Sequence, residues 1–286
     1  MISNSINYNV PYELYDLDIK QAAKFAVVID NAKSDLEFRS EYVEYPVYKR
    51  RPQTIQLLRK LETALVPCSY DEWLHKRGII TSQAYSIDYS KVTMLDMLDL
   101  YVIPDDHIII NHGFKTIDGP VFTDRRNGQL AGICVRNTTS NIGFASDEKY
   151  TTSNFGWFLY GYDDYEYDDE IYIVEGVFDR LKMIENGYNA IALANASPTA
   201  LQIACLTKKY NNLKSCLDND IYGMIGSRIL HRVLGIPLYT TKLKDPGCYH
   251  NEPIELVELD IGYIENFIRT NKHTLLDVIE RHLPYN

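Results

Sequence analysis

The most constraining feature of this chain is a regular alternation of short apolar segments with amphipathic segments between residues 171 and 243. The apolar segments have the length of strands, and the segments between them have the apolar spacing of helices. The expected strands are 171–174, 189–194, 213–217 and 236–243, and the expected helices are 178–185, 222–234 and one that opens at Ser197-Pro198 and runs to about residue 209. Such an alternation predicts a parallel sheet with helices on its faces.

Acidic residues follow three of these strands at the point where each strand ends. Glu175 comes directly after the first strand, Asp218 after the third and Asp245 after the fourth. The carboxyl ends of parallel strands lie at one edge of a sheet, which is where open α/β sheets bind ligands. Asp179 falls in the first turn of the helix that follows Glu175, and Asp220 points the same way as Asp218 if the chain there is still extended.

Carboxylates that converge at such an edge repel one another, and a hard divalent cation relieves that repulsion. Ligands that are all oxygen suit Mg²⁺ or Mn²⁺, and Mg²⁺ held by carboxylates usually also bridges phosphates. The pattern therefore favours phosphoryl or nucleotidyl transfer. Each acid taken alone is more often a turn residue or a helix cap, so the interpretation depends on the three strand ends carrying acids together.

The first 165 residues have a different organisation. Apolar spacing predicts helices over 16–32, 54–65 and 70–76, an apolar segment over 93–101, and strands over 107–110 and 119–135. Asn127-Gly128 between two apolar runs predicts a hairpin turn. The segment 163–170 is almost entirely acidic residues and tyrosine, and it marks a candidate boundary. A further helical pattern follows residue 255.

Composition and charge exclude several classes of protein. A net charge of −10 excludes a uniformly basic coat for nucleic acid, although it does not exclude a local basic groove. The apolar runs fall well short of the roughly 20 residues that a membrane span needs, and residues 1–4 do not begin a signal peptide. Five cysteines without a Cys-x-x-Cys spacing argue against a disulfide scaffold and against zinc. We therefore expect a cytoplasmic protein with no membrane partner and no zinc.

Around the acids, the sequence resembles the Toprim domain that bacterial-type primases share with topoisomerases and some nucleases. That domain carries Glu-Gly after its first strand and Asp-x-Asp after its third, matched here by Glu175-Gly176 and Asp218-Asn219-Asp220. Other pieces, in the same order, resemble the catalytic core of bacterial and phage primases. These pieces are Leu74-His75-Lys76-Arg77-Gly78-Ile79, 122–128, 132–136, 149–153, Leu159-Tyr160-Gly161, and Asp179 after Glu175-Gly176. The likeness covers about residues 70 to 250.

The resemblance implies an α/β fold: a Toprim domain with a central parallel sheet flanked by helices, a primase-type mixed α/β (α+β) subdomain before it, and a short helical tail after it. The implied boundaries are 1–50 for an N-terminal extension, 51–165 for the primase subdomain, 166–255 for the Toprim domain and 256–286 for the tail. The implied activity is that of a DNA primase, a nucleotidyltransferase that makes short RNA primers. Its partners would be a single-stranded DNA template, ribonucleoside triphosphates, and a replicative helicase or another replisome protein.

The resemblance also implies roles for particular residues. Glu175, Asp218 and Asp220 would be catalytic, and the same three acids with Asp179 and Asp245 would hold Mg²⁺ or Mn²⁺. Template and nucleotide would contact a second set of residues: Arg125, Arg136, Lys149 and Tyr150. Taken as bare residues, such cations are ordinary surface side chains, and a tyrosine is about as often part of the core.

The chain departs from the family's pattern in several places. The cysteines cannot build the family's N-terminal zinc-binding domain, and the usual Asp-Pro-Asp is Asp245-Pro246-Gly247 here. The family's Gly-Thr-Ser-like turn reads Ala194-Asn195-Ala196-Ser197. These changes fit a diverged, phage-borne member. Two alternatives stay open: a Toprim nuclease, and a non-catalytic primase-like replication factor that binds a helicase.

Overall fold

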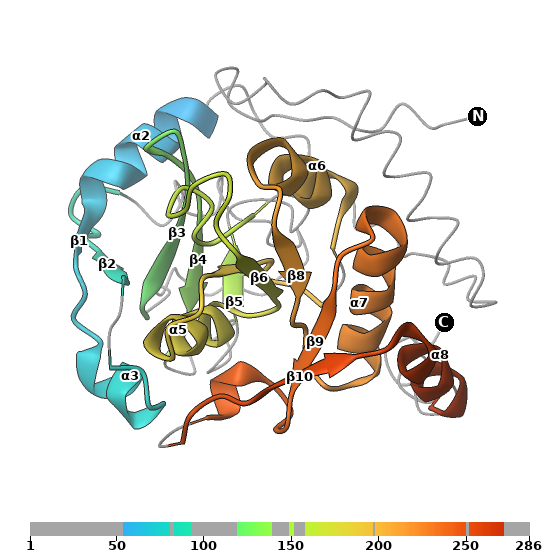
Figure 1. The fold of residues 1–286 in the computed structure, drawn as a ribbon. Helices are drawn as coiled ribbons and strands as arrows, with labels where there is room; N and C mark the ends of the chain where they lie inside the picture. Colours follow the sequence, from blue (N-terminus) through green and yellow to red (C-terminus); the bar gives the residue numbers. More distant parts are fainter. Residues whose placement is uncertain are drawn as a thin grey trace, which may run out of the picture.

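The computed structural model describes residues 54–80, 83–92, 119–138, 149–151, 158–196, 198–249 and 252–271. In these ranges the strands form two five-stranded sheets, one at the N-terminal side and one at the C-terminal side of the chain (Figure 1). The helix predicted over 16–32, the apolar segment over 93–101, the strand over 107–110 and the tail beyond residue 271 lie outside the described residues.

The N-terminal sheet is antiparallel throughout, with its strands in sequence order. Its strands are β1 (Leu65–Pro67), β2 (Tyr85–Ile87), β3 (Val121–Arg126), β4 (Gln129–Arg136) and β5 (Lys149–Thr151). Helix α2 (Thr54–Ala64) packs on this sheet through Leu58 and Leu61, and α3 (Asp71–Lys76) follows β1. Both predicted helices are thus confirmed. The predicted hairpin turn is confirmed too, since Asn127 and Gly128 have φ angles of 50° and 77°.

The C-terminal sheet has the order β10-β9-β8-β6-β7. Its first four strands along the chain are parallel, as the alternation predicts: β6 (Ile171–Val174), β7 (Ala190–Ala192), β8 (Leu213–Ser215) and β9 (Leu238–Thr241). The connecting helices are α5 (Val177–Glu185), α6 (Ala200–Lys209) and α7 (Ile221–Leu234). The chain leaves β6 toward β7 on one side and later returns to β8 on the other, so the strand order reverses at β6 and β8.

Two details differ from the expectation. Strand β10 (Leu256–Leu259) was not predicted, and it pairs antiparallel with β9, so the sheet is mixed and extends into the range expected to be a helical tail. Helix α8 (Ile261–Thr270) follows it and packs against α7. Helix α6 begins at Ala200, with Thr199 as its N-cap in place of the expected Ser197, because the Thr199 side chain accepts the Gln202 amide at 3.2 Å.

Two apolar clusters cover the two faces of the C-terminal sheet. One face packs against α6 and α7 through residues such as Leu206 and Ile229. The other face packs against α5, and this cluster also contains Phe122 and Cys134 of the β3–β4 hairpin. The two sheets therefore share one buried core, and the hairpin lies next to α5 (Figure 1). Within the described ranges, no helix has the length and apolar character needed to cross a membrane.

Candidate active site

Three carboxylates meet beyond the carboxyl ends of the parallel strands. Asp179 comes from the first turn of α5, Asp218 from the loop after β8, and Asp245 from the loop after β9. Each offers an oxygen, and these oxygens all lie within 4.8 Å of one another. We call these residues the acidic triad. They lie where the strand order reverses, which is the position at which open α/β sheets bind ligands.

Backbone amides fix Asp179 in place. Its Oδ2 accepts the Gly176 amide at 2.6 Å, and its Oδ1 accepts the Gly247 amide at 3.0 Å. A Cβ atom at Gly176 would come within 2.6 Å of Oδ2, and one at Gly247 within 2.8 Å of Oδ1. A side chain at either position would therefore press against the Asp179 carboxylate. In Asp245-Pro246-Gly247, the glycine that replaces the family's second acid leaves room for this carboxylate.

The other two predicted acids lie beside the triad but outside the 4.8 Å group. Glu175 accepts the Asp218 amide through Oε1 at 3.3 Å. Asp220 is the N-cap of α7, and its Oδ1 accepts the Tyr222 amide at 3.0 Å and the Gly223 amide at 3.1 Å. The Asp220 backbone is extended, and its side chain caps the first turn of α7. Its assignment as a ligand stays a prediction.

The electrostatics of the triad centre on Asp218. Its Oδ1 is buried and has no hydrogen-bond partner in the described structure. Burial, followed by the negative charges of Asp179 and the other nearby acids, raises the pKa of Asp218 to about 9. A buried carboxylate oxygen without a donor, facing other carboxylates, is a site that a cation would stabilise. The triad's ligands are all oxygen, which fits Mg²⁺ or Mn²⁺.

The triad lies at one side of a cavity of about 400 Å³. Its polar lining includes Glu175 and the triad together with two arginines, Arg77 and Arg136, from the N-terminal half. The Arg77 guanidinium lies 4.4 Å from the Trp73 ring centroid and 5.4 Å from that of Phe178. The Arg136 guanidinium lies 5.5 Å from the Phe178 ring centroid. Both arginines therefore pack against the Phe178 ring, an arrangement that favours a cation.

The other predicted basic residues have different positions. Arg125 donates to Glu62 Oε1 at 2.7 Å and to the Gly128 carbonyl at 3.0 Å, and it does not line the cavity. The neighbouring Arg126 is buried and forms an ion pair with Asp124. In β5, the backbone of Lys149 pairs with Arg136 and that of Tyr150 with Val135, while their side chains lie outside the described structure.

Sequence reasoning missed Arg77 as a site residue. The signal was present, because Arg77 is the arginine of the stretch Leu74 to Ile79 that carries part of the resemblance. It follows α3, more than 90 positions before the acids, and only the packing of α3 on Phe178 brings it to the cavity. Phe178, Cys134 and Cys248 also line the cavity, and neither Phe178 nor Cys134 was expected there.

Comparison with known proteins finds solved structures with a similar fold. The sequence matches no protein-family model. No curated protein matches it either.

Among solved structures, the DnaG catalytic core is similar at 19% identity and a TM-score of 0.53, over 76% of this chain and 79% of that one. A DNA primase domain from Pseudomonas aeruginosa matches at 18% identity and a TM-score of 0.40, over 91% and 85% of the two chains. A DnaG primase catalytic domain bound to single-stranded DNA matches at 18% identity and a TM-score of 0.41, over 88% and 83%. The resemblance inferred from the motifs is thereby confirmed at the level of the fold: this chain has the fold of a DnaG-type primase catalytic core.

Proposed function

We propose that this protein is the catalytic core of a DNA primase, which joins ribonucleoside triphosphates on a single-stranded DNA template and releases pyrophosphate. One observation carries the proposal: a single cavity is lined by both the acidic triad, which we call its acidic side, and Arg77 and Arg136, which we call its arginine side. That combination suits a metal-bound triphosphate, whose oxygens need both a divalent cation and arginine donors. The fold of a DnaG catalytic core supports the same reading.

The acidic side would hold Mg²⁺ or Mn²⁺ through Asp179, Asp218 and Asp245, with Glu175 and Asp220 next to them. A cation bound there would lower the pKa of the attacking 3′-hydroxyl and neutralise charge on the phosphates. Asp179 is held rigidly by two amides, so its oxygens are already oriented before a ligand arrives. Asp218 would give up its proton when the cation binds.

The arginine side would bind the triphosphate. Arg77 and Arg136 present guanidinium donors to the cavity, and both are braced against the Phe178 ring. Their planar forks match phosphate oxygens two at a time, which fixes the orientation of the nucleotide. Lys149, whose backbone pairs with Arg136, stays a predicted contact to template or nucleotide, as do Tyr150 and Arg125.

The remaining assignments follow from this function. We propose the division 1–50, 51–165, 166–255 and 256–286, with β10 joining the last part to the C-terminal sheet. A replicative helicase or another replisome protein would be the protein partner, and the cytoplasm of a host cell would be the place of action. The net charge of −10 implies that contact with the DNA template is confined to a local basic surface.

The test is incorporation of radiolabelled ribonucleotides on single-stranded DNA with Mg²⁺ or Mn²⁺. Wild-type protein should make short RNA products, and Asp218→Asn should make none, because Asp218 is the least satisfied acid of the triad. Glu258→Gln is a matched control, since Glu258 is an exposed carboxylate on the outer strand β10. RNA synthesis retained in Asp218→Asn would contradict the proposal.

The same assay separates the two alternatives. Cleavage of the DNA with Mg²⁺ and without nucleotides would indicate a Toprim nuclease. No product of either kind from the wild type, even with a cognate helicase added, together with no Mn²⁺ binding, would indicate a non-catalytic replication factor.

A further inference from the structure

A buried ion pair lies at the turn end of the β3–β4 hairpin, away from the cavity. Arg126 donates from Nε to Asp124 Oδ1 at 2.7 Å and from Nη2 to Asp124 Oδ2 at 3.0 Å. The exposed fractions of these two residues are only 5% and 1%. Arg126 is therefore bound in a two-point geometry that fixes its orientation.

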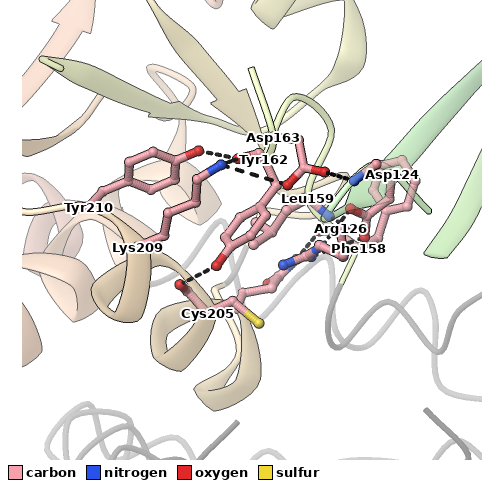
Figure 2. A network of polar contacts seen from close by, with 11 residues as sticks. Asp124, Arg126, Phe158, Leu159, Tyr162, Asp163, Cys205, Lys209 and Tyr210 are labelled. Atoms are coloured by element: carbon pink, nitrogen blue, oxygen red, sulfur yellow. Dashed lines mark hydrogen bonds and ion pairs between the residues drawn. The ribbon is translucent and has the colours of Figure 1, made fainter. Parts of the chain in front are cut away.

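This pair connects the hairpin to residues 159–162, which precede the first strand of the C-terminal sheet. Asp124 Oδ2 also accepts the Leu159 amide at 3.2 Å, and the Arg126 guanidinium lies 4.0 Å from the Tyr162 ring centroid. Figure 2 shows the two side chains lying between the hairpin and this segment. We call Asp124, Arg126, Leu159 and Tyr162 the hairpin clamp.

The clamp is anchored in turn to α6. The Tyr162 hydroxyl donates to the Cys205 carbonyl at 3.0 Å, and the Tyr162 carbonyl accepts Lys209 Nζ at 2.8 Å and the Tyr210 hydroxyl (Figure 2). The turn itself is held by a separate bond, from the Gly128 amide to Asp163 Oδ2 at 2.7 Å. The hairpin's far end is thus tied to a helix of the C-terminal half.

Stability alone does not explain such a pair. Taking two charges out of water costs several kcal/mol each, and a buried ion pair is often no more stable than apolar side chains of similar volume. The pair does fix the orientation of the Arg126 guanidinium, because two parallel hydrogen bonds allow only one orientation. A role in geometry therefore accounts for the clamp better than a role in stability.

The β3–β4 hairpin connects the clamp to the cavity, so a small rotation at the clamp becomes a larger displacement at the other end of the hairpin. Its other end carries Cys134 and Arg136, which line the cavity, and Arg136 is the last residue of β4. The eight residues of β4 extend roughly 23 Å at about 3.3 Å per residue. A rotation of about 3° at the clamp would move Arg136 by about 1 Å, and misplacement of that size can lower a reaction rate about 100-fold.

We propose that Asp124 and Arg126 are positioning residues that set where Arg136 stands relative to the acidic triad, and so set the affinity for the triphosphate of a nucleotide. This inference rests on the proposed function. The clamp is separate from the site itself: the triad comes from the first turn of α5 and from two loops of the C-terminal sheet, and neither Asp124 nor Arg126 lines the cavity.

The experiment compares the wild type with Arg126→Met, with the double variant Asp124→Leu/Arg126→Met, and with Arg228→Met. The double variant replaces both charged side chains by apolar ones and leaves no unpaired buried charge. It should therefore fold even if Arg126→Met does not. Arg228→Met is the matched control, because Arg228 is equally buried and pairs with Glu265 at 2.9 Å between α7 and α8, away from the cavity. The measurements are Mn²⁺ binding, affinity for a fluorescent ATP analogue with Mg²⁺, the KM and kcat of primer synthesis, and hydrogen exchange of residues 129–136.

The clamp variants should bind the ATP analogue about tenfold or more weakly, with a matching rise in KM, faster exchange along β4 and unchanged Mn²⁺ binding. Arg228→Met should lower the melting temperature without changing nucleotide affinity. Wild-type nucleotide affinity in the folded double variant would overturn the proposal.

If the wild type binds no nucleotide and makes no RNA, the proposed function fails, and the hydrogen exchange then decides the clamp. Unchanged exchange along β4 in the clamp variants would overturn the positioning role. Faster exchange confined to β4 would uphold the link between the clamp and the end of the hairpin that carries Arg136.

Discussion

The two sides of the cavity are built in different ways. The acidic side is formed by Asp179, Asp218 and Asp245, which follow neighbouring parallel strands of one sheet. The arginine side is formed by Arg77, which follows α3, and Arg136 of β4, and both pack against Phe178 of the other half. The first side follows from a local rule about strand ends, whereas the second depends on long-range packing.

The two sides also differ in charge and in what surrounds the charged groups. Asp218 has a buried oxygen without a hydrogen bond and a raised pKa. Arg77 and Arg136 lie over aromatic rings, which favour a cation. A cation would therefore stabilise the acidic side, and an anion would stabilise the arginine side. Changes to the two sides should have separable effects.

The largest effect is expected from Asp179→Asn. An amide keeps the shape of the side chain but removes one charge from the triad, so Mn²⁺ affinity and primer synthesis should fall together by about 100- to 1,000-fold. Titration of Mn²⁺ followed by electron paramagnetic resonance, together with the synthesis assay, would measure both. Glu258→Gln is the control, and synthesis within tenfold of the wild type in Asp179→Asn would show that the triad does not hold the metal.

A smaller effect is expected from Arg77→Met and Arg136→Met. Each removes charge-assisted hydrogen bonds to phosphate, worth about 1.5–3 kcal/mol, so nucleotide affinity should fall about 10- to 100-fold. Mn²⁺ binding should not change, because neither arginine belongs to the triad. Arg136→Lys should recover only part of the loss, since an ammonium lacks the planar fork.

Arg232→Met is the control for the arginine variants, because Arg232 pairs with Glu265 on the surface near α8. If the arginine variants lost Mn²⁺ binding as well, the two sides would not be independent, and the comparison would fail.

Much of the architecture could be predicted from the sequence because it follows from local rules. The alternation after residue 171 gives the parallel strands, and Asn127-Gly128 gives the hairpin, since both depend on the chemistry of a few adjacent residues. The triad was within reach for the same reason. Each acid directly follows or opens a predicted element, and the edge at which they meet is fixed by the direction of the strands.

The remaining features could not be predicted because competing or distant interactions decide them. Asp220 accepts the first amides of α7, a capping role that its place after a predicted strand does not reveal. Arg125 pairs with Glu62 of α2, a residue that no local pattern connects to the hairpin. Strand β10 exists because β9 offers an unpaired edge, which the composition of 256–259 does not reveal.

The smallest effect is one of stability, and it is expected on the acidic side alone. Asp218 has its pKa raised to about 9 in the folded protein, whereas the ordinary value for an aspartate is 3.8. Between these two pH values the folded state therefore holds a proton that the unfolded state has lost, so the metal-free protein should become less stable as the pH rises from about 4 to about 9. Mg²⁺ should reverse the loss, because it binds only the folded form and takes the place of that proton.

Asp218→Asn should therefore melt at a higher temperature than the metal-free wild type at pH 8, by about 2–4 °C for each ~1 kcal/mol gained. The difference should shrink toward pH 5, and added Mg²⁺ should stabilise the wild type but not the variant. Arg136→Met should show neither response, because its guanidinium does not titrate in this range. Thermal unfolding at pH 5 and pH 8, with and without Mg²⁺, measures all of these. If Asp218→Asn were less stable than the metal-free wild type at pH 8, the acidic side would be stable without a cation. The two sides would then differ only in how they are built, one from neighbouring strand ends and the other by long-range packing.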